Sequence, residues 1–461
     1  MFDKNFLWGT ASSSYQIEGA FAEDGKGVSI WDTFSNKPGN IAHNENGNEA
    51  CDHYHRYRED IVLMKSLGIQ AYRFSISWAR IFPDGIVKDS DGNVNFNKAG
   101  LDFYDNIVNC CLENGIEPFI TLYHWDLPQA LEDNGGWLNR QTAYIFADYA
   151  EFICEHFSDR VVNIATINEP QIISGLGYMN GLHAPGKKLD CISVLSVIHH
   201  LALAHGLAVA KMRAVAKQPI KTGFSSTGDL CFPASECDED IDAARAESFK
   251  IVTGNMTFNH TIFCDMTCLG RYPDIAGTGL HLEKGLEKIG HYKELPFVKD
   301  GDSELMYQPI DFLGINVYNG HEVSVTGHIK KKPGSPRTAL GWPVTPGVMN
   351  YGIRYMYERY NLPIYIFEDG LACNDIISLD GKVHDSNRID FLTRYLTDLE
   401  KAYKAGVPIL GYFHWSFTDN FEWHSGYDPR FGLIYVDYET QQRIPKDSAY
   451  WYSDLIKKSC N

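Results

Sequence analysis

Residues 161–170 read VVNIATINEP. This stretch begins with β-branched and apolar residues, which is typical of a strand buried on both faces of a sheet. It ends in Asn168, Glu169 and a proline, and polar side chains are costly at the end of a buried strand unless they have a task there. Residues 363–370, PIYIFEDG, repeat this design and end in Glu368. Two carboxylates at the ends of two buried strands are the pair of groups that glycosidic bond hydrolysis requires.

Short apolar runs of this kind recur along the chain and alternate with amphipathic stretches of helical period, which predicts βα units and a parallel sheet. Eight such units predict a single α/β domain over residues 1–461, a (β/α)8 TIM barrel whose long βα loops form the active-site pocket. No linker, low-complexity run or charge block marks a domain boundary. The predicted strands are residues 6–11, 71–77, 117–125, 161–168, 221–226, 311–318, 363–368 and 408–415. The predicted helices are residues 53–67, 98–114, 140–157, 194–215, 238–266, 348–360 and 389–405, with a closing helix from residue 446.

The composition limits which partners the protein could bind and in which cell compartment we expect it. A net charge of −18 argues against a nucleic acid or an anionic membrane surface as partner. No run approaches ~18 consecutive apolar residues, so we expect no membrane span. The first residues show no signal peptide pattern, so we expect a cytoplasmic protein. The eleven cysteines include no CxxC pair, which predicts free thiols rather than disulfides or a zinc site.

In a TIM barrel, the catalytic residues follow the carboxyl ends of the strands. Polar and aromatic residues of this sequence gather there. Carboxylates, amides, a histidine and several tryptophans around one pocket fit a pyranose, which presents hydroxyls on its edge and C–H groups on its faces. In chain order these residues are Gln16, Arg73, His124, Trp125, Asn168, Glu169, Asn316, Tyr318, Glu368, Trp415, Glu422 and Trp423.

Eight ordered motifs carry a resemblance to a known family. They are FLWGTA (6–11), YQIEG (15–19), YRFSISW (72–78), YHWDLP (123–128), TINEP (166–170), GLHAPG (181–186), DFLGIN (311–316) and WSFTDNFEW (415–423). With these motifs the chain resembles glycoside hydrolase family 1, the β-glucosidase family, over essentially its whole length. The resemblance implies a retaining exo-hydrolase that needs no cofactor and no metal. It would release terminal, unphosphorylated β-D-glucose, with galactose and fucose left open, from disaccharides such as cellobiose, short oligosaccharides or aryl glycosides. Whether the protein forms a homo-oligomer stays open.

The family's roles are carried over to the matching positions of this sequence. By this resemblance, Glu368 is the nucleophile and Glu169 the general acid/base of a double displacement. Arg73 would keep Glu368 ionised, Tyr318 would donate a hydrogen bond to it, and Asn168 would hold the sugar's 2-hydroxyl. Asn316 is grouped with these supporting residues. The sugar-binding positions match Gln16, His124, Trp125, Trp415, Glu422 and Trp423, and Trp342 is expected in the wall beside the leaving group.

The sequence departs from the family pattern beside the nucleophile and leaves two alternatives to weigh. Asp369 stands where the family usually has Asn, and strand alternation predicts that it points away from the pocket. A 6-phospho-β-glucosidase would carry Ser and Lys in the loop after the last strand, whereas Glu422 here would repel a phosphate dianion. A catalytically inactive barrel that binds glycan or protein would lack Glu169 or Glu368, and both are present. His424 is unusual in this loop, and the sequence gives it no role beyond a possible subsite contact.

Overall fold

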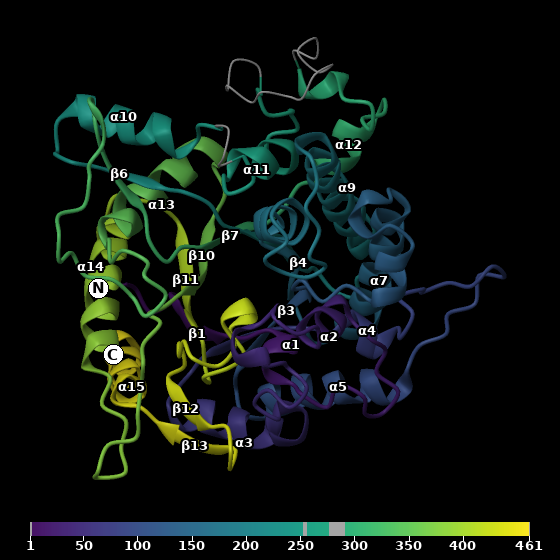
Figure 1. The fold of residues 1–461 in the computed structure, drawn as a ribbon, viewed down its shortest axis with the longest axis horizontal. Helices are drawn as coiled ribbons and strands as arrows, with labels where there is room; N and C mark the ends of the chain where they lie inside the picture. Colours follow the sequence, from purple (N-terminus) through teal and green to yellow (C-terminus); the bar gives the residue numbers. More distant parts are fainter. Residues whose placement is uncertain (1, 252–255, 276–290, 461) are drawn as a thin grey trace.

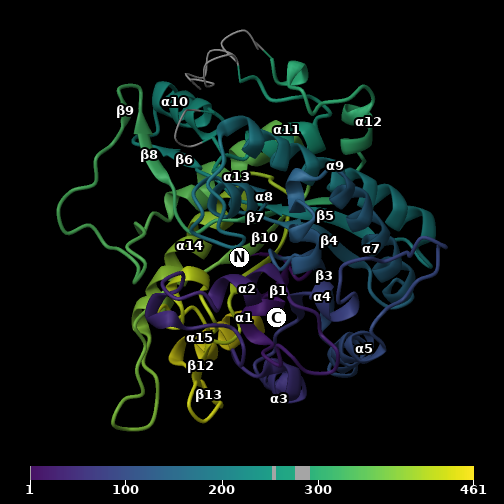
Figure 2. The same ribbon diagram turned by 45° about the vertical axis from the view of Figure 1, so that its right-hand side comes forward.

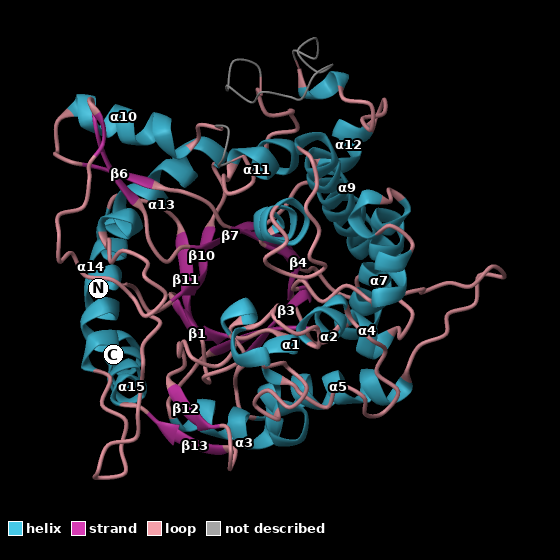
Figure 3. Cartoon of the chain, in the orientation of Figure 1, coloured by secondary structure: helices cyan, strands magenta, loops and turns pink. Residues whose placement is uncertain are grey.

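The structure is a computed structural model and describes residues 2–251, 256–275 and 291–460. At its centre, eight parallel strands close into a barrel in the order β1-β11-β10-β7-β5-β4-β3-β2, visible as the central ring of strands in Figure 3. Each barrel strand coincides with one of the eight strands predicted from the sequence, so the predicted (β/α)8 barrel is confirmed. The barrel strands are β1 (Leu7–Ala11), β2 (Ala71–Ser75), β3 (Glu117–Tyr123), β4 (Asn163–Asn168), β5 (Lys221–Ser226), β7 (Phe312–Asn316), β10 (Ile364–Asp369) and β11 (Ile409–Trp415).

Helices follow the strands and surround the barrel (Figure 1). The helix predicted over residues 238–266 is instead two helices, α10 (Asp238–Ser248) and α11 (Thr261–Cys268), and residues 252–255 between them lie outside the described residues. Before α11, Asn259 Oδ1 accepts a hydrogen bond from the Thr261 backbone N–H at 2.8 Å, which starts a separate helix. The other long helices are α3 (His53–Ser66), α5 (Lys98–Glu113), α7 (Gln141–Phe157), α9 (Cys191–Val215), α13 (Gly347–Tyr360), α14 (Ser386–Lys404) and α15 (Asp447–Cys460).

The loops after the strands contain further short elements, which the sequence did not predict. The sheet β6-β8-β9 lies beside α10 and outside the barrel, as Figures 1 and 2 show, and a β12-β13 hairpin follows β11. The additional strands are β6 (Cys231–Pro233), β8 (His321–Ser324), β9 (Gly327–His328), β12 (Ile434–Asp437) and β13 (Gln442–Pro445). The short helices are α1 (Ser14–Ile17), α2 (Ile30–Ser35), η1 (Ala42–Asn44), α4 (Trp78–Ile81), α6 (Gln129–Asp133), η2 (Gly136–Leu138), α8 (Pro170–Ile172), η3 (Ile173–Met179), η4 (Tyr292–Glu294), α12 (Asp302–Met306) and η5 (Trp423–Ser425). The assignment of residues 1–461 to one domain stays a prediction.

An aromatic cluster fills the inside of the barrel. Phe119 from β3 and Phe413 from β11 meet with ring centres 4.9 Å apart, and Phe312 from β7 meets Phe367 from β10 at 5.4 Å. All four side chains are buried. The barrel is therefore a packed core rather than a pore, and this core supports the side chains that line the pocket.

The helix α9 is long and apolar enough to cross a membrane by length and composition alone, and it is the one such helix among the described residues. Within its most apolar window, 83% is buried inside the molecule. The helix packs against α7 and against the barrel strand β4. Its apolar surface is thus part of the protein core.

Candidate active site

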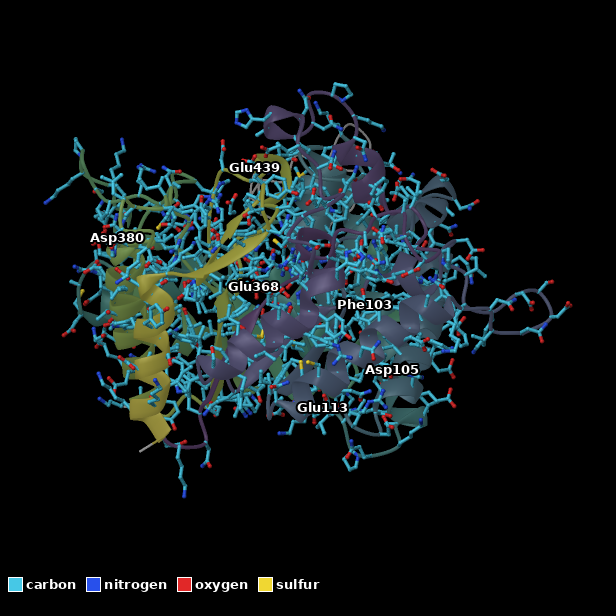
Figure 4. All side chains as sticks on the ribbon, turned by 90° about the horizontal axis from the view of Figure 1, so that it is seen from below. Phe103, Asp105, Glu113, Glu368, Asp380 and Glu439 are labelled. Atoms are coloured by element: carbon cyan, nitrogen blue, oxygen red, sulfur yellow. The ribbon has the colours of Figure 1, made fainter. Side chains whose placement is uncertain are left out.

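A pocket of about 660 Å³ opens at the carboxyl ends of the barrel strands. Glu368, which lies in this pocket, is near the middle of the molecule in Figure 4, whereas Asp380 and Glu113 lie toward its edges. Of the thirteen residues predicted for the site, Gln16, Arg73 and Asn168 are buried directly behind the wall. The ten that line the pocket are His124, Trp125, Glu169, Asn316, Tyr318, Trp342, Glu368, Trp415, Glu422 and Trp423.

Both oxygens of the Glu368 carboxylate are engaged by donors. Arg73, from β2, donates from Nη1 to Oε1 at 2.7 Å, and the Tyr318 hydroxyl donates to Oε2 at 2.8 Å. The Arg73 guanidinium is held in turn by Thr121 Oγ1 at 3.1 Å and lies over the Phe367 ring at 4.8 Å. Glu368 is therefore a fixed carboxylate with a positive charge beside it, as an ionised nucleophile requires.

A register shift in β10 turns Glu368 into the pocket. Strict alternation would place Glu368 outside the barrel, because Phe367 already packs into the interior cluster. The pairing of β10 with β7 is irregular between Ile366 and Glu368, and a bulge of this kind redirects a side chain. Asp369 then points away from the pocket, as predicted, and its Oδ2 accepts a hydrogen bond from the Tyr412 hydroxyl at 2.8 Å.

Glu169 occupies a strained position at the start of α8. Its φ of 48° lies in the left-handed region, which costs a non-glycine residue free energy. Its backbone N–H donates to the Ser225 carbonyl oxygen at 2.8 Å, which fixes this turn. Its Oε1 accepts from Asn316 Nδ2 at 2.6 Å, and Ser225 Oγ donates to Asn316 Oδ1 at 2.5 Å. The backbone and one neutral amide thus hold the Glu169 carboxyl in the pocket.

A chain of hydrogen bonds connects Arg73 to the far side of the pocket. Arg73 Nη2 donates to Asn168 Oδ1 at 2.6 Å, so the other end of this amide, Nδ2, faces His124 Nε2 at 3.1 Å. His124 Nε2 is therefore the acceptor, and Nδ1 carries the proton. This Nδ1 is buried and has no hydrogen-bond partner among the described residues, which leaves it free to donate to a ligand.

The surroundings separate the pKa values of the two glutamates. Burial raises the pKa of both, but the Arg73 charge and the Tyr318 hydroxyl oppose the rise at Glu368. Burial and the negative charge of Glu368 together raise the pKa of Glu169 well above its usual value. Because Arg73 donates directly to Glu368, whereas the neutral Asn316 amide donates to Glu169, we expect Glu169 to keep its proton while Glu368 ionises.

The end of the pocket near β11 combines a carboxyl group with aromatic faces. Burial, with the nearby Glu368 charge, raises the pKa of Glu422 to about 8. Within the described parts of the chain, Glu422 Oε2 has no hydrogen-bond partner. Gln16 Nε2 donates to the Phe421 carbonyl oxygen at 2.8 Å and so ties α1 to this loop. The Trp125 and Trp423 rings lie 4.5 Å apart, centre to centre, and provide apolar faces next to Glu422.

The structure adds pocket residues that sequence reasoning did not assign. Gln171, Met179 and Asn180 line the pocket, and all three lie in the segment that follows Glu169 in the chain. His183 and His424 also line it; the first lies within a quoted motif, and the second had no assigned role. The remaining lining residues are Ile172, Gly175, Leu176, Thr227, Gly228, Thr257, Phe258, Val317, Asn319, Leu340, Ser425 and Phe431.

A second, larger cavity of about 850 Å³ lies beside the start of α14. Cys373, His384 and Asp385 are among its lining residues, and none of the thirteen predicted site residues lines it. The aspartates in its lining are engaged by arginines, since Asp375 and Asp385 pair with Arg388 and Asp390 pairs with Arg394. The smaller pocket, which holds the two predicted glutamates, is therefore the candidate active site. In the described parts of the chain, no group of three or more His, Cys, Asp or Glu side chains could hold a metal ion.

Comparison with known proteins gives a consistent result. Residues 1–460 match the family described as Glycosyl hydrolase family 1. The chain is 43% identical to beta-glucosidase A of Thermotoga maritima and 44% identical to beta-glucosidase A of Acetivibrio thermocellus, with 99% of this chain and 98% of each relative covered. It is 40% identical to a bifunctional beta-D-glucosidase/beta-D-fucosidase of Bifidobacterium breve, with the same coverage. The solved structure of beta-glucosidase from Thermotoga maritima in complex with glucoimidazole matches with a TM-score of 0.86 and 42% identity over 99% of both chains. This chain belongs to glycosyl hydrolase family 1.

Proposed function

We propose that the protein is a retaining β-glucosidase-type exo-hydrolase. It would release a terminal, unphosphorylated β-D-glucose from disaccharides, short oligosaccharides or aryl glycosides by double displacement. One observation supports this proposal above all others: Glu169 and Glu368 line the same pocket, in surroundings that raise the pKa of Glu169 well above its usual value while Arg73 and Tyr318 oppose the rise at Glu368. Relatives named as β-glucosidases, which match over nearly the full chain, support the glucoside as substrate.

In the first step, Glu368 attacks the anomeric carbon and Glu169 gives its proton to the leaving oxygen. The bond between the sugar and the leaving group breaks as the bond to the Glu368 carboxylate forms. Arg73 and Tyr318 hold that carboxylate in place, so the nucleophile does not have to be reoriented for attack.

In the second step, the now ionised Glu169 takes a proton from water as the water oxygen attacks the anomeric carbon, and the bond from that carbon to Glu368 breaks. Glu368 leaves as a carboxylate, and the sugar departs with its original anomeric configuration. Asn316 stays hydrogen-bonded to Glu169 and keeps the carboxyl directed into the pocket for both steps. The same two residues therefore complete the cycle without any further group.

The sugar itself would be bound by groups that are free in the pocket. His124 Nδ1–H and Glu422 Oε2 are both buried and lack partners within the described residues, so each can pair with a sugar hydroxyl. Trp125, Trp415 and Trp423 supply the flat faces on which the ring's C–H groups pack. Trp342, which also lines the pocket, would contact the leaving group.

Two alternative functions find less support. A 6-phospho-β-glucosidase needs a cation for the phosphate, and the described residues that line the pocket include no lysine or arginine. An inactive glycan-binding or protein-binding barrel would not need two carboxyls with separated pKa values. We also propose a reducing, cytoplasmic location, which is supported by the lack of a disulfide among the ten cysteines from Cys51 to Cys373.

A panel of aryl β-glycosides tests the proposal. The β-glucoside should be cleaved with the highest kcat/KM, and its 6-phosphate with a much lower one, while galactosides and fucosides measure how strictly the glycone is selected. Proton NMR of the first product should show the β-anomer of the released sugar. The α-anomer would rule out double displacement, and no release from any glycoside would favour the inactive barrel.

A further inference from the structure

Ser225 contacts both of the groups that place the proposed acid. It lies on β5, the barrel strand between β4 and β7. The strand β4 ends at Asn168, directly before Glu169, and β7 ends at Asn316. The carbonyl oxygen of Ser225 accepts from the Glu169 backbone N–H at 2.8 Å, and its Oγ donates to Asn316 Oδ1 at 2.5 Å. Ser225 is fully buried and takes no part in the double displacement itself.

Arg73 sets the direction of the hydrogen bonds that lead to Ser225. A guanidinium can only donate, so the end of the Asn168 amide that lies 2.6 Å from Arg73 Nη2 is its oxygen. The Asn316 amide approaches the same oxygen at 3.2 Å and must present its nitrogen there, since two amide oxygens would repel each other. The same nitrogen donates to Glu169 Oε1 at 2.6 Å. The oxygen of the Asn316 amide is therefore the end that faces Ser225.

The Ser225 hydroxyl satisfies this amide oxygen. A serine hydroxyl can donate or accept, but opposite an amide oxygen it must donate. Asn316 is buried, and among the described residues no other side chain donates to its Oδ1. Both of its remaining side-chain hydrogen bonds start from Nδ2. Without the Ser225 hydroxyl, Asn316 would thus keep a buried, unpaired oxygen, which costs free energy unless the amide moves to another donor.

The position of the Asn316 amide matters for the proton of Glu169. The carbonyl oxygen of a protonated carboxyl is its better acceptor, so the N–H that points at Oε1 favours a proton on Oε2. The same N–H stabilises the ionised carboxylate and so opposes the rise in the pKa of Glu169 that burial causes. An amide that moved away from Glu169 would lose both effects.

We propose that Ser225 is a positioning residue of the general acid/base. By donating to Asn316 Oδ1, it keeps the Asn316 amide directed at Glu169 Oε1 and so keeps the catalytic proton on Oε2. This inference rests on the proposed function, because it requires that Glu169 protonates the leaving group. It predicts that the loss of the Ser225 hydroxyl affects those substrates that need a proton on the leaving oxygen.

The test compares two glucosides that differ in this need. Phenol is a poor leaving group and must be protonated, whereas a dinitrophenol is acidic enough to leave without much help. Ser225→Ala should lower kcat/KM for phenyl β-glucoside by about tenfold and change that for dinitrophenyl β-glucoside by no more than about twofold. Ser225→Thr, which keeps the hydroxyl, should restore most of the loss. Thr222→Val is the matched control, because Thr222 is buried in the same strand and its hydroxyl has no hydrogen-bond partner within the described residues.

The pH profile supplies a readout that a purely structural role would not change. In Ser225→Ala the weakened Asn316 bond should raise the pKa of Glu169, so the alkaline limb of kcat/KM for phenyl β-glucoside should move up by about half to one pH unit. The acidic limb, which follows Glu368, should stay in place. The other titratable and charged groups around Glu169 are unchanged in the variant; they are Glu368, Arg73, Glu422 and Tyr318.

The outcomes separate the inference from the proposed function. Equal losses for the two glucosides, no loss for phenyl β-glucoside, or an alkaline limb that stays in place would overturn the inference while leaving the β-glucosidase proposal intact. Ser225→Thr with the melting temperature of the wild type but the activity of Ser225→Ala would overturn it as well. Wild-type protein that cleaves neither glucoside would overturn the proposed function itself, and the inference with it.

Discussion

The hydrogen bond from Tyr318 to Glu368 offers a quantitative test of the site. Replacing Tyr318 with Phe removes one hydroxyl, which donates to Glu368 Oε2 at 2.8 Å, and leaves the ring in place. A hydrogen bond to a charged group contributes about 1.5–3 kcal/mol. Because this bond favours the ionised form of Glu368, its loss should raise the pKa of Glu368. One pKa unit corresponds to about 1.36 kcal/mol, so the expected rise is about one to two units.

The rise should appear on one side of the pH profile only. The nucleophile must be ionised, so the acidic limb of kcat/KM follows Glu368 and should move to higher pH by that amount. The alkaline limb follows loss of the proton from Glu169, and in that range Glu368 is already ionised in both proteins. Arg73 still donates to Oε1 at 2.7 Å in the variant, which places the expected shift near the lower end of the range.

The assay is kcat/KM for an aryl β-glucoside measured from about pH 4 to 9, a range that spans both limbs of the expected bell. Tyr450→Phe serves as the control, since Tyr450 is 58% exposed on α15 and lies outside the pocket. An acidic limb that stays in place, or a shift of the alkaline limb instead, would refute the assignment of Glu368 as the group that Tyr318 keeps ionised.

Four further substitutions test the remaining assignments. Glu368→Ala should lower turnover by about four orders of magnitude or more, and azide should restore part of it as a product of inverted configuration; a retained product would contradict the nucleophile. Glu169→Ala should lower cellobiose cleavage by about 10²–10⁴-fold and cleavage of a glucoside with a highly acidic phenol far less, so equal losses would count against the acid. Glu422→Ser should raise KM for aryl β-glucosides by about tenfold, and an unchanged KM would remove Glu422 from the sugar site. Burial raises the pKa of Asp369 well above its usual value, so the folded protein favours the protonated carboxyl and the wild type loses stability as the pH rises. The melting temperature of Asp369→Asn should therefore rise relative to that of the wild type with increasing pH. A difference in melting temperature that stays constant with pH would show that Asp369 does not titrate on unfolding.

The barrel strands were predictable because of their burial. A strand covered by helices outside and by the core inside appears in the sequence as a short continuous apolar run, as residues 161–168 do. The long helices also matched, since their caps and periodicity are local features. The prediction of one helix over residues 238–266 was wrong, because α10 ends at Ser248 and a separate helix α11 begins at Thr261, where the Asn259 side chain accepts from the Thr261 N–H. Hydrophobic periodicity does not show this break.

The members of the site were predictable as a set, but the contacts that orient them were not. Motif resemblance pointed to Glu169, Glu368 and Asn316, each at the end of a strand. Ser225, which holds both the Glu169 backbone and the Asn316 side chain, lies on β5 and carries no signal of its own in the sequence. The pairing of His183 with His424 joins loops 241 positions apart, and only the closed barrel brings them together.

The orientation of the two carboxylates shows why regular patterns fail at this site. In β10 the alternation that places Phe367 inside would turn Glu368 out, and a register shift after Ile366 reverses this. In β4 the pairing with β5 also shifts, between Ala165 and Asn168, immediately before Glu169. Three pocket residues adopt left-handed backbone conformations, each costing on the order of 1–3 kcal/mol, and the regular, tightly packed barrel below them offsets this cost. These residues are Trp125, Glu169 and Trp423. Local sequence rules thus predict the part of the chain that stabilises the fold, and they fail where the chain positions its reactive groups.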